Sequence, residues 1–315
     1  MGINLSEVTF SYRISKKGIS KYAIKDINLN IENNSEFIAI VGHTGSGKST
    51  LVQTLNNLIS PTFGSINVEF DDEKGFVRYD IQANGKKTKY CLRRDLNKKI
   101  KYKSRVYLKP LRRHIGLVFQ FPEYQIFEET VLKDIMFGPI NFLKDEEKAE
   151  SEAKRIAEMM GISDLLDKSP FALSGGQMRK VAIAGILASK PDVLVLDEPT
   201  VGLDPIAKRE LLKFLKYLNE VEKKTIIIIT HDMDVVGEYA KRVLVLKKGQ
   251  IMFDGSKEEL FKDSDLIDRC DLNYPSIINI MKSLKKKLRL DLDIYKYNIE
   301  DAFKEILKAK GEDHE

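Results

Sequence analysis

The sequence predicts an α/β fold built on a mainly parallel sheet, with a small antiparallel layer beside it. Short apolar runs rich in β-branched residues alternate along the chain with amphipathic segments. Such runs are typical of strands that are buried on both faces between covering helices. The four clearest runs are residues 37–41, 193–196, 225–230 and 243–246. We therefore expect these runs to form the parallel sheet.

The antiparallel layer is predicted from the beginning of the chain. Residues 3–12 and 23–31 have the pattern of antiparallel strands, and residues 64–70 continue that pattern. We expect the three segments to lie beside the parallel sheet.

Length and composition limit the possible classes of protein. A chain of 315 residues that is 43% hydrophobic can bury one large core and a small appendage, or two modest domains. The net charge of +5 is too small for a dedicated nucleic-acid binder. Cys91 and Cys270 have no paired spacing, so we expect ordinary thiols in a reducing compartment. We also expect no secretion signal and no membrane span, so a role at a membrane would need another protein.

Residues 74–113 depart from the α/β pattern. They contain far more Lys and Arg than Asp and Glu and few apolar residues in sequence, so we interpret them as an insertion. A solvated basic surface loop is the simpler explanation. Contact with anionic lipid headgroups or nucleic acid is the alternative.

The end of the chain is predicted to contain two amphipathic helices. Their apolar stripes are Ile277, Met281, Leu284 and Leu288 in the first helix, and Ile299, Phe303, Ile306 and Leu307 in the second. Tyr274-Pro275 is a signal for the start of the first helix. The stripes could pack on the chain's own domain or on another chain, and the pattern leaves both open.

A glycine-rich loop follows the predicted strand at 37–41 and precedes a helical stretch at 51–58. Its sequence is Gly42-His43-Thr44-Gly45-Ser46-Gly47-Lys48-Ser49-Thr50. A strand, such a loop and a helix in this order form a phosphate-binding loop, in which backbone N–H groups and the helix N-terminus attract an anion. We expect Lys48 to contact the β- and γ-phosphates of a nucleotide and the hydroxyl of Ser49 to bind Mg²⁺.

Two carboxylates and a histidine follow two of the other predicted strands. Asp197 and Glu198 end the run at 193–196, and His231 follows the run at 225–230. Because neighbouring side chains of a strand point in opposite directions, we expect Asp197 to hold Mg²⁺ and Glu198 to act as general base for the attacking water. Ligands bind at the carboxyl ends of such strands, so we expect His231 to bridge the γ-phosphate and that water.

A second helix start also has the character of a phosphate site. Leu173-Ser174-Gly175-Gly176-Gln177 precede a helical stretch, and Ser174 is a suitable N-cap. The chain's own nucleotide is expected at the first loop. We therefore interpret this second start as contacting a nucleotide held by another chain; a capped, tightly packed helix start is the alternative.

At these residues the sequence resembles an ABC ATPase. The Walker A motif matches residues 42–50, the signature motif matches 173–177, Walker B matches 193–197, and the resemblance extends over residues 3–260. The resemblance implies that Tyr12 stacks on adenine, that Gln120 of the Q-loop lies at the Mg²⁺ and water, and that Asp204 of the D-loop lies across a dimer. For Tyr12, packing within its own domain is the competing explanation.

Within that family the sequence is similar to the second ATPase paralogue of the energy-coupling-factor transporters. The similar stretches are residues 42–45, 119–130 and 178–185. The similarity implies ATP and Mg²⁺ as ligands and a heterodimer with the other paralogue. It further implies docking on a transmembrane coupling protein with a vitamin- or metal-binding subunit, at the cytoplasmic face of the cell membrane. Residues 1–260 would form the nucleotide-binding domain, and residues 261–315 a helical extension that helps to dimerise the pair.

The expected function is therefore ATP hydrolysis that powers uptake of a micronutrient. The motor of another ABC importer remains a second interpretation, and a soluble ABC ATPase that acts on nucleic acid a third. Long heptad arms and a second phosphate loop would favour the third, and the sequence has neither. The transported solute is not encoded in a motor domain.

Overall fold

The computed structural model describes residues 2–12, 14–15, 18–19, 21–32, 35–72, 75–83, 89–93, 102–103 and 108–310. Within these ranges no helix has both the length and the apolar character needed to cross a lipid bilayer.

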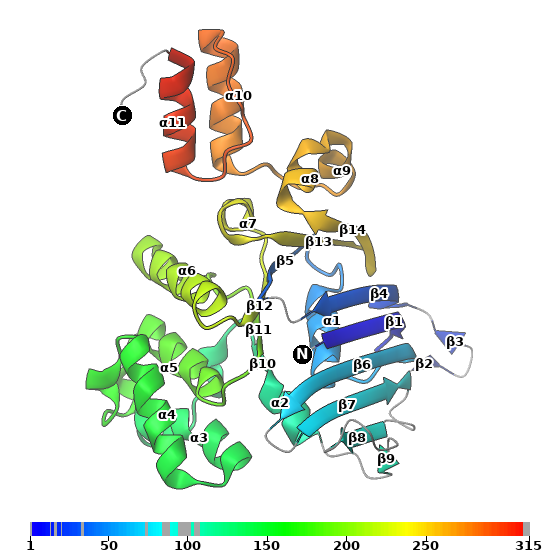
Figure 1. Ribbon diagram of the computed structural model, residues 1–315, viewed down its shortest axis with the longest axis vertical. Helices are drawn as coiled ribbons and strands as arrows, with labels where there is room; N and C mark the ends of the chain where they lie inside the picture. Colours follow the sequence, from blue (N-terminus) through cyan, green and yellow to red (C-terminus); the bar gives the residue numbers. More distant parts are fainter. Residues whose placement is uncertain are drawn as a thin grey trace.

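The main sheet has the strand order β10-β11-β12-β5-β13-β14 (Figure 1). Its strands are β5 (Phe37–Val41), β10 (Ile115–Val118), β11 (Val193–Asp197), β12 (Thr225–Ile229), β13 (Arg242–Lys247) and β14 (Gln250–Ser256). Neighbours pair in parallel except β13 and β14, which are antiparallel. The four apolar runs thus lie in one mainly parallel sheet, and the predicted α/β fold is confirmed.

A second, antiparallel sheet has the order β4-β1-β6-β7-β8-β9. Its strands are β1 (Gly2–Phe10), β4 (Ile24–Glu32), β6 (Phe63–Asp72), β7 (Gly75–Gln82), β8 (Lys89–Arg93) and β9 (Tyr102–Lys103). In a separate sheet, β2 (Ile14–Ser15) pairs antiparallel with β3 (Gly18–Ile19). The three segments predicted as an antiparallel layer are β1, β4 and β6.

Two hydrophobic cores lie on the two faces of the main sheet. In β5, Phe37, Ala39 and Val41 face the core beneath the helices, whereas Ile38 and Ile40 face the core shared with the antiparallel sheet. Successive side chains of a strand point to opposite faces, so a continuous apolar run can serve both cores. This arrangement holds the strand ends, and the loops that follow them, in fixed positions.

The helices are divided between the two cores (Figure 1). The bounds are α1 (Lys48–Leu55), α2 (Lys109–His114), α3 (Val131–Leu143), α4 (Glu146–Met159), α5 (Gly175–Leu187), α6 (Pro205–Glu220), α7 (Met233–Tyr239), α8 (Lys257–Lys262), α9 (Ser264–Arg269), α10 (Ser276–Leu288) and α11 (Ile299–Lys310). Residues of α1 pack in the core next to the antiparallel sheet, and residues of α3 to α7 pack in the other. Short 3₁₀ turns include η2 (Pro122–Gln125).

The prediction of a solvated basic loop at 74–113 is wrong near both ends of the segment. Residues 109–113 belong to α2, in which Leu111 is buried. It is also wrong for residues 75–82. These residues form β7, which pairs with β6, and Val77, Tyr79 and Ile81 of this strand are buried. The alternation of apolar and polar residues in β7 is the signal of a half-buried strand, and the excess of basic residues over the wider segment concealed it. Residues 74, 84–88, 94–101 and 104–107 of the predicted insertion lie outside the described residues.

The two helices at the end of the chain form a hairpin that projects away from both sheets (Figure 1). Met281 of α10 is buried with Leu292 and Ala302, and Ile278 reaches the main core. Of the predicted stripes, Leu288, Ile299 and Phe303 are exposed, so these three residues do not pack on the chain's own domain. In α11 the packed face runs through Ala302, Ile306 and Ala309.

Candidate functional site

Four strands of the main sheet end at one edge, and each is followed by candidate residues. The glycine-rich loop follows β5, and Gln120 follows β10. Asp197 ends β11 with Glu198 directly after it, and His231 follows β12. These four strands are parallel neighbours, so their carboxyl ends lie together. The structure thus brings the predicted residues to one edge of the sheet.

The glycine-rich loop needs glycine at two positions where the backbone approaches other segments closely. Gly42 has φ 139°, and a Cβ there would lie 2.1 Å from the carbonyl oxygen of Leu246. Gly47 has φ 104°, and its Cβ would lie 2.5 Å from the carbonyl oxygen of Ala23. Any other residue would clash with this backbone and would strain its own.

The loop is also held by hydrogen bonds to the turn between β13 and β14. The backbone N–H of Gly249 donates to the carbonyl of Ser46 at 2.9 Å, and the carbonyl of Gly249 accepts from the N–H of Lys25 at 2.8 Å. From inside the loop, Nζ of Lys48 donates to the carbonyls of Gly42 at 2.7 Å and His43 at 2.9 Å. The loop is therefore fixed by its own chain.

Two observations show that the loop fits an anion. Among the described residues, the buried hydroxyl of Ser46 has no hydrogen-bond partner. Burial lowers the pKa of Lys48, and the carboxylates of Glu198 and Asp197 oppose this change. A phosphate would supply both an acceptor for the hydroxyl and a negative charge for the ammonium group.

A cavity of about 610 Å³ opens beside the loop. It is lined by Tyr12, Lys21, Tyr22, Ala23, Gly45, Gly47, Lys48, Ser49 and Thr50. The ring of Tyr12 is largely exposed, and its hydroxyl lies 3.0 Å from Oγ1 of Thr50, so the predicted adenine-stacking residue does lie at this cavity. Lys21, Tyr22 and Ala23 were not predicted, because the segment between β1 and β4 carries no motif.

Asp197 and Ser49 meet at the mouth of the loop. The Ser49 hydroxyl donates a hydrogen bond to the Asp197 carboxylate. Burial raises the pKa of Asp197, against the opposing effects of this hydrogen bond and the charge of Lys48. A half-buried carboxylate beside a hydroxyl is a donor set that suits Mg²⁺, which prefers oxygen ligands.

Glu198 and His231 also lie together. Nδ1 of His231 is 3.0 Å from both carboxylate oxygens of Glu198. Glu198 has φ 49°, in the left-handed region, and its N–H donates to the carbonyl of Ile229 at 3.0 Å. The carboxylates of Asp197 and Glu198 therefore have separate partners, as predicted. The reason differs from the prediction, because a left-handed backbone turn at Glu198, and not the alternation of side chains along an extended strand, directs the two side chains apart.

Three other predicted residues at this edge have less contact with the chain. His43 and Thr44 are exposed on the loop, and Gln120 is exposed just beyond β10. Nε2 of His43 lies 3.6 Å from a carboxylate oxygen of Asp271, a contact that no sequence pattern indicated.

The second helix start, at α5, is capped by its own chain. The N–H of Gln177 donates to Oγ of Ser174, and Oε1 of Gln177 accepts from the N–H of Ser174. The predicted N-cap is thus confirmed as one half of a capping box. Gly175 is exposed and Gly176 half-buried at this helix start. Asp204 caps α6 in a similar way, since it accepts from the N–H groups of two following residues.

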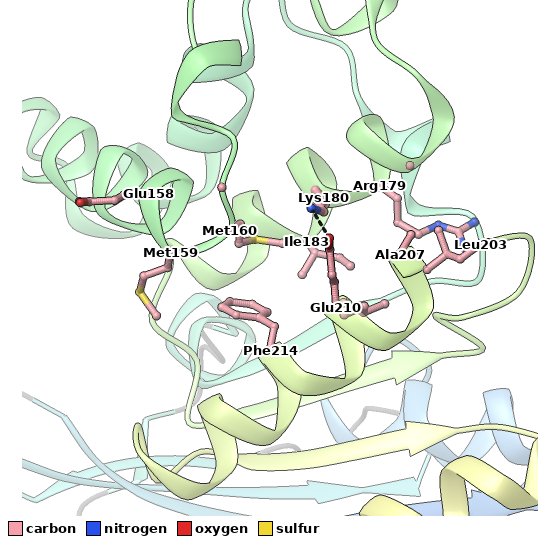
Figure 2. A pocket seen from close by; sticks show the side chains of 13 residues that line it. Glu158, Met159, Met160, Arg179, Lys180, Ile183, Leu203, Ala207, Glu210 and Phe214 are labelled. Carbon is pink, nitrogen blue, oxygen red and sulfur yellow. Dashed lines mark hydrogen bonds and ion pairs between the residues drawn. The ribbon is translucent and has the colours of Figure 1, made fainter. Parts of the chain in front are cut away.

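A second cavity, of about 460 Å³, lies between α4, α5 and α6 (Figure 2). Gly176 and Leu203 line it, so it borders both the predicted signature motif and the predicted D-loop.

Comparisons with known proteins identify the family. Residues 24–201 match the ABC transporter family. The chain is 42% identical over 312 residues to the energy-coupling factor transporter ATP-binding protein EcfA2 of Ligilactobacillus salivarius, covering 99% of this chain and 98% of that protein. It is 41% identical over 307 residues to EcfA2 of Bacillus licheniformis, covering 97% of this chain and 96% of that protein.

Solved structures agree with this assignment. The structure of CbiO1 from Clostridium perfringens, described as part of the ABC transporter complex CbiONQ, is 32% identical, has a TM-score of 0.65 and covers 91% of this chain and 95% of that one. The ATP-binding cassette MJ0796, in a dimeric post-hydrolysis state bound to ADP and phosphate, is 26% identical with a TM-score of 0.61, covering 81% of this chain and 98% of that one. The chain is therefore a member of the ABC transporter family, among the energy-coupling factor transporter ATP-binding proteins.

Proposed function

We propose that this chain binds and hydrolyses ATP as one of two ATPase subunits that power micronutrient uptake by an energy-coupling factor transporter. The observation that carries the proposal is the pairing of Glu198 with His231 beside the Ser49 and Asp197 pair, at the edge where Lys48 and the loop form an anion site. The relatives named energy-coupling factor transporter ATP-binding protein support the transporter assignment.

The side chains have distinct roles in this proposal. Lys48 binds the β- and γ-phosphates, and the backbone N–H groups of residues 42–50 surround them. Glu198 accepts a proton from the attacking water as general base, while His231, held by Glu198, orients the γ-phosphate and this water. Gln120, just beyond β10, contacts this water and the Mg²⁺ when the nucleotide is bound. Tyr12 stacks on the adenine.

Ser49, Asp197 and Gln120 are the residues that would hold Mg²⁺ with the nucleotide. When bound, the ion neutralises charge on the β- and γ-phosphates. The hydrogen bond between Ser49 and Asp197 already brings two of these oxygen donors together.

The signature residues act on the nucleotide of a partner ATPase. In this proposal Ser174, Gly175, Gly176 and Gln177 close on ATP held by the second subunit, and Asp204 lies next to that contact. The paralogous subunit supplies its own signature to the ATP bound here, so that two nucleotides are enclosed between two chains. Hydrolysis reopens the pair.

A surface of exposed aromatic residues is the proposed contact with the transmembrane coupling subunit, which holds the substrate-binding membrane subunit. Phe121, Tyr124 and Phe127 are all exposed, and Phe127 packs edge-on against Phe137 of α3 with ring centroids 4.8 Å apart. Exposed aromatic clusters are typical of protein interfaces. The chain would then lie at the cytoplasmic face of the membrane, bound through its partners.

The substitution Glu198→Gln tests the hydrolytic role. The variant keeps the shape of the side chain but loses the base, so we expect normal ATP binding and turnover at least about 100-fold slower. Glu220→Gln, a surface carboxylate on α6, is the matched control and should leave turnover unchanged. Near-normal turnover in Glu198→Gln would reject the assignment.

Purification of the chain with its natural partners tests the transporter assignment. In mild detergent we expect a second ATPase subunit and membrane proteins to co-purify with it. Recovery of RNA or DNA without any membrane protein would instead favour a soluble ATPase that acts on nucleic acid.

A further inference from the structure

A single buried guanidinium joins three segments that carry the proposed nucleotide contacts. Arg179 lies on α5 and is 5% exposed. Its Nε and Nη2 donate to the carboxylate of Glu123 at 3.3 and 3.0 Å. Its Nη1 donates to the carbonyl oxygens of Pro199 at 3.3 Å and Val201 at 2.5 Å.

Each of these partners belongs to a segment with a proposed role. Glu123 is in η2, three residues after Gln120 and between Phe121 and Tyr124 of the exposed aromatic surface. Pro199 and Val201 lie in the loop that connects Glu198 with the D-loop. Arg179 itself follows the signature residues on the same helix. One side chain thus connects the surface that faces the membrane partner with the loop next to the general base.

The chemistry of this contact is specific for arginine. A planar guanidinium has donors in a fixed fork, so it can bind a carboxylate with two nitrogens and still direct a third toward backbone carbonyls. The ammonium group of lysine is a compact charge that cannot match both sets of acceptors. Glu123 is only 15% exposed, so water can replace little of what Arg179 provides.

The neighbouring residue shows a contrasting ion pair on the same helix. Lys180 reaches Glu210 of α6 at 3.1 Å, and both side chains are substantially exposed. Figure 2 shows this pair at the cavity between α5 and α6, where the Arg179 side chain extends toward the loop that carries Leu203. Lys180 therefore offers a matched control, with the same helix and charge but a surface contact.

We propose that Arg179 is a positioning residue that makes the η2 segment, the start of α5 and the loop at 199–201 move together. When the membrane partner displaces the aromatic surface, Glu123 and Arg179 transmit the displacement to the loop that follows Glu198. This inference rests on the proposed function, since it concerns how the partner controls hydrolysis at that site. It assigns Arg179 no direct contact with ATP.

The experiment compares the two ATPase subunits alone with the complete complex in detergent. For each, the KM for ATP, the kcat and the melting temperature are measured in the wild type and in Arg179→Lys, Glu123→Gln and Lys180→Gln. We expect Arg179→Lys and Glu123→Gln to reduce the stimulation of kcat by the membrane subunits at least about fivefold, the lower end of coupling between sites. KM should change less than about twofold, because the phosphate loop is untouched. Lys180→Gln should behave as the wild type.

The double variant sharpens the test. If Arg179 and Glu123 act through each other, combining Arg179→Lys with Glu123→Gln should reduce stimulation little more than either change alone. If Arg179→Lys fails to fold, Glu123→Gln decides. Its single amide oxygen still accepts one hydrogen bond and so helps to keep the fold, whereas the charge-assisted contact through two oxygens is lost.

Two results would overturn the inference. In the first, the membrane subunits stimulate kcat in both variants as much as in the wild type. In the second, kcat falls by the same factor with and without the membrane subunits, and the fall parallels a lower melting temperature. The second result would mean that the ion pair only stabilises the fold. A wild-type complex without ATPase activity would contradict the proposed function itself, which distinguishes the two failures.

Discussion

The two glycine-rich helix starts of this chain differ in how they are completed. Helix α1 begins after Gly47, which has a left-handed backbone and provides no side-chain cap, and the nearby Ser46 hydroxyl is buried without a partner. Helix α5 begins at Ser174, whose side chain forms a reciprocal capping box with Gln177. The N-terminus of α1 needs an anion to satisfy its hydrogen-bond donors, whereas the N-terminus of α5 is capped by its own side chains. This difference suits a chain that holds one nucleotide and presents a finished surface to another.

The largest expected effect comes from removing the positive charge of Lys48 at the N-terminus of α1. Lys48→Met eliminates charge-assisted hydrogen bonds to phosphate, so the Kd for ATP should rise about 10- to 100-fold, which matches a loss of about 1.5–3 kcal/mol. Isothermal titration calorimetry with a non-hydrolysable ATP analogue measures the change in Kd. Lys241→Met, at an exposed position, is the control. An unaltered Kd in Lys48→Met would place the nucleotide elsewhere.

A smaller effect is expected at the N-terminus of α5. Ser174→Ala removes the cap of α5 and should lower the free energy of unfolding by about 0.5–2 kcal/mol. Ser256→Ala removes an equivalent capping box from α8 and should have a similar effect on stability. Denaturant unfolding tests this equality.

The two serine variants should differ in function. Only Ser174→Ala should lower the ATPase rate of the assembled pair, and neither should change the Kd for ATP of the single chain. If both variants lowered the rate equally, α5 would have no role beyond stability.

The smallest effect is expected at the start of α6. Hydrogen bonds from the backbone N–H groups of Ala207 and Ile206 lower the pKa of Asp204. A depressed folded-state pKa adds stability above the unfolded pKa, and this contribution disappears as the pH falls through the folded-state value. Asparagine caps a helix equally well without a charge. Asp204→Asn should therefore make the melting temperature slightly less dependent on pH below about pH 4. If the melting temperatures of the wild type and the variant fell equally steeply with pH in this range, the prediction would be contradicted.

The fold was largely predictable because its signals are local. Apolar runs such as 225–230 and the motif of the glycine-rich loop depend on neighbouring residues, and the rule for parallel strand ends then placed Glu198 near His231. β7 was missed because its alternating residues were averaged with basic neighbours. The left-handed backbone of Glu198 was missed because alternation along an extended strand was assumed to continue.

Contacts between distant segments were not predictable. Arg179 and Glu123 are 56 residues apart, and their pairing depends on how α5 packs against η2. Two adjacent basic residues, Arg179 and Lys180, were the only hint, and the sequence does not show which of them is buried or what it pairs with. The same holds for Tyr22, which lines the cavity without belonging to any motif.

The hydrogen bonds from the turn at Gly249 to Ser46 and Lys25 have a consequence for how ATP binds. A loop already fixed by a neighbouring hairpin loses little conformational entropy when its ligand arrives. Association should then be fast, and little of the binding free energy is needed to order the loop. In the proposed pair of ATPase subunits, more of it remains available to draw the two chains together.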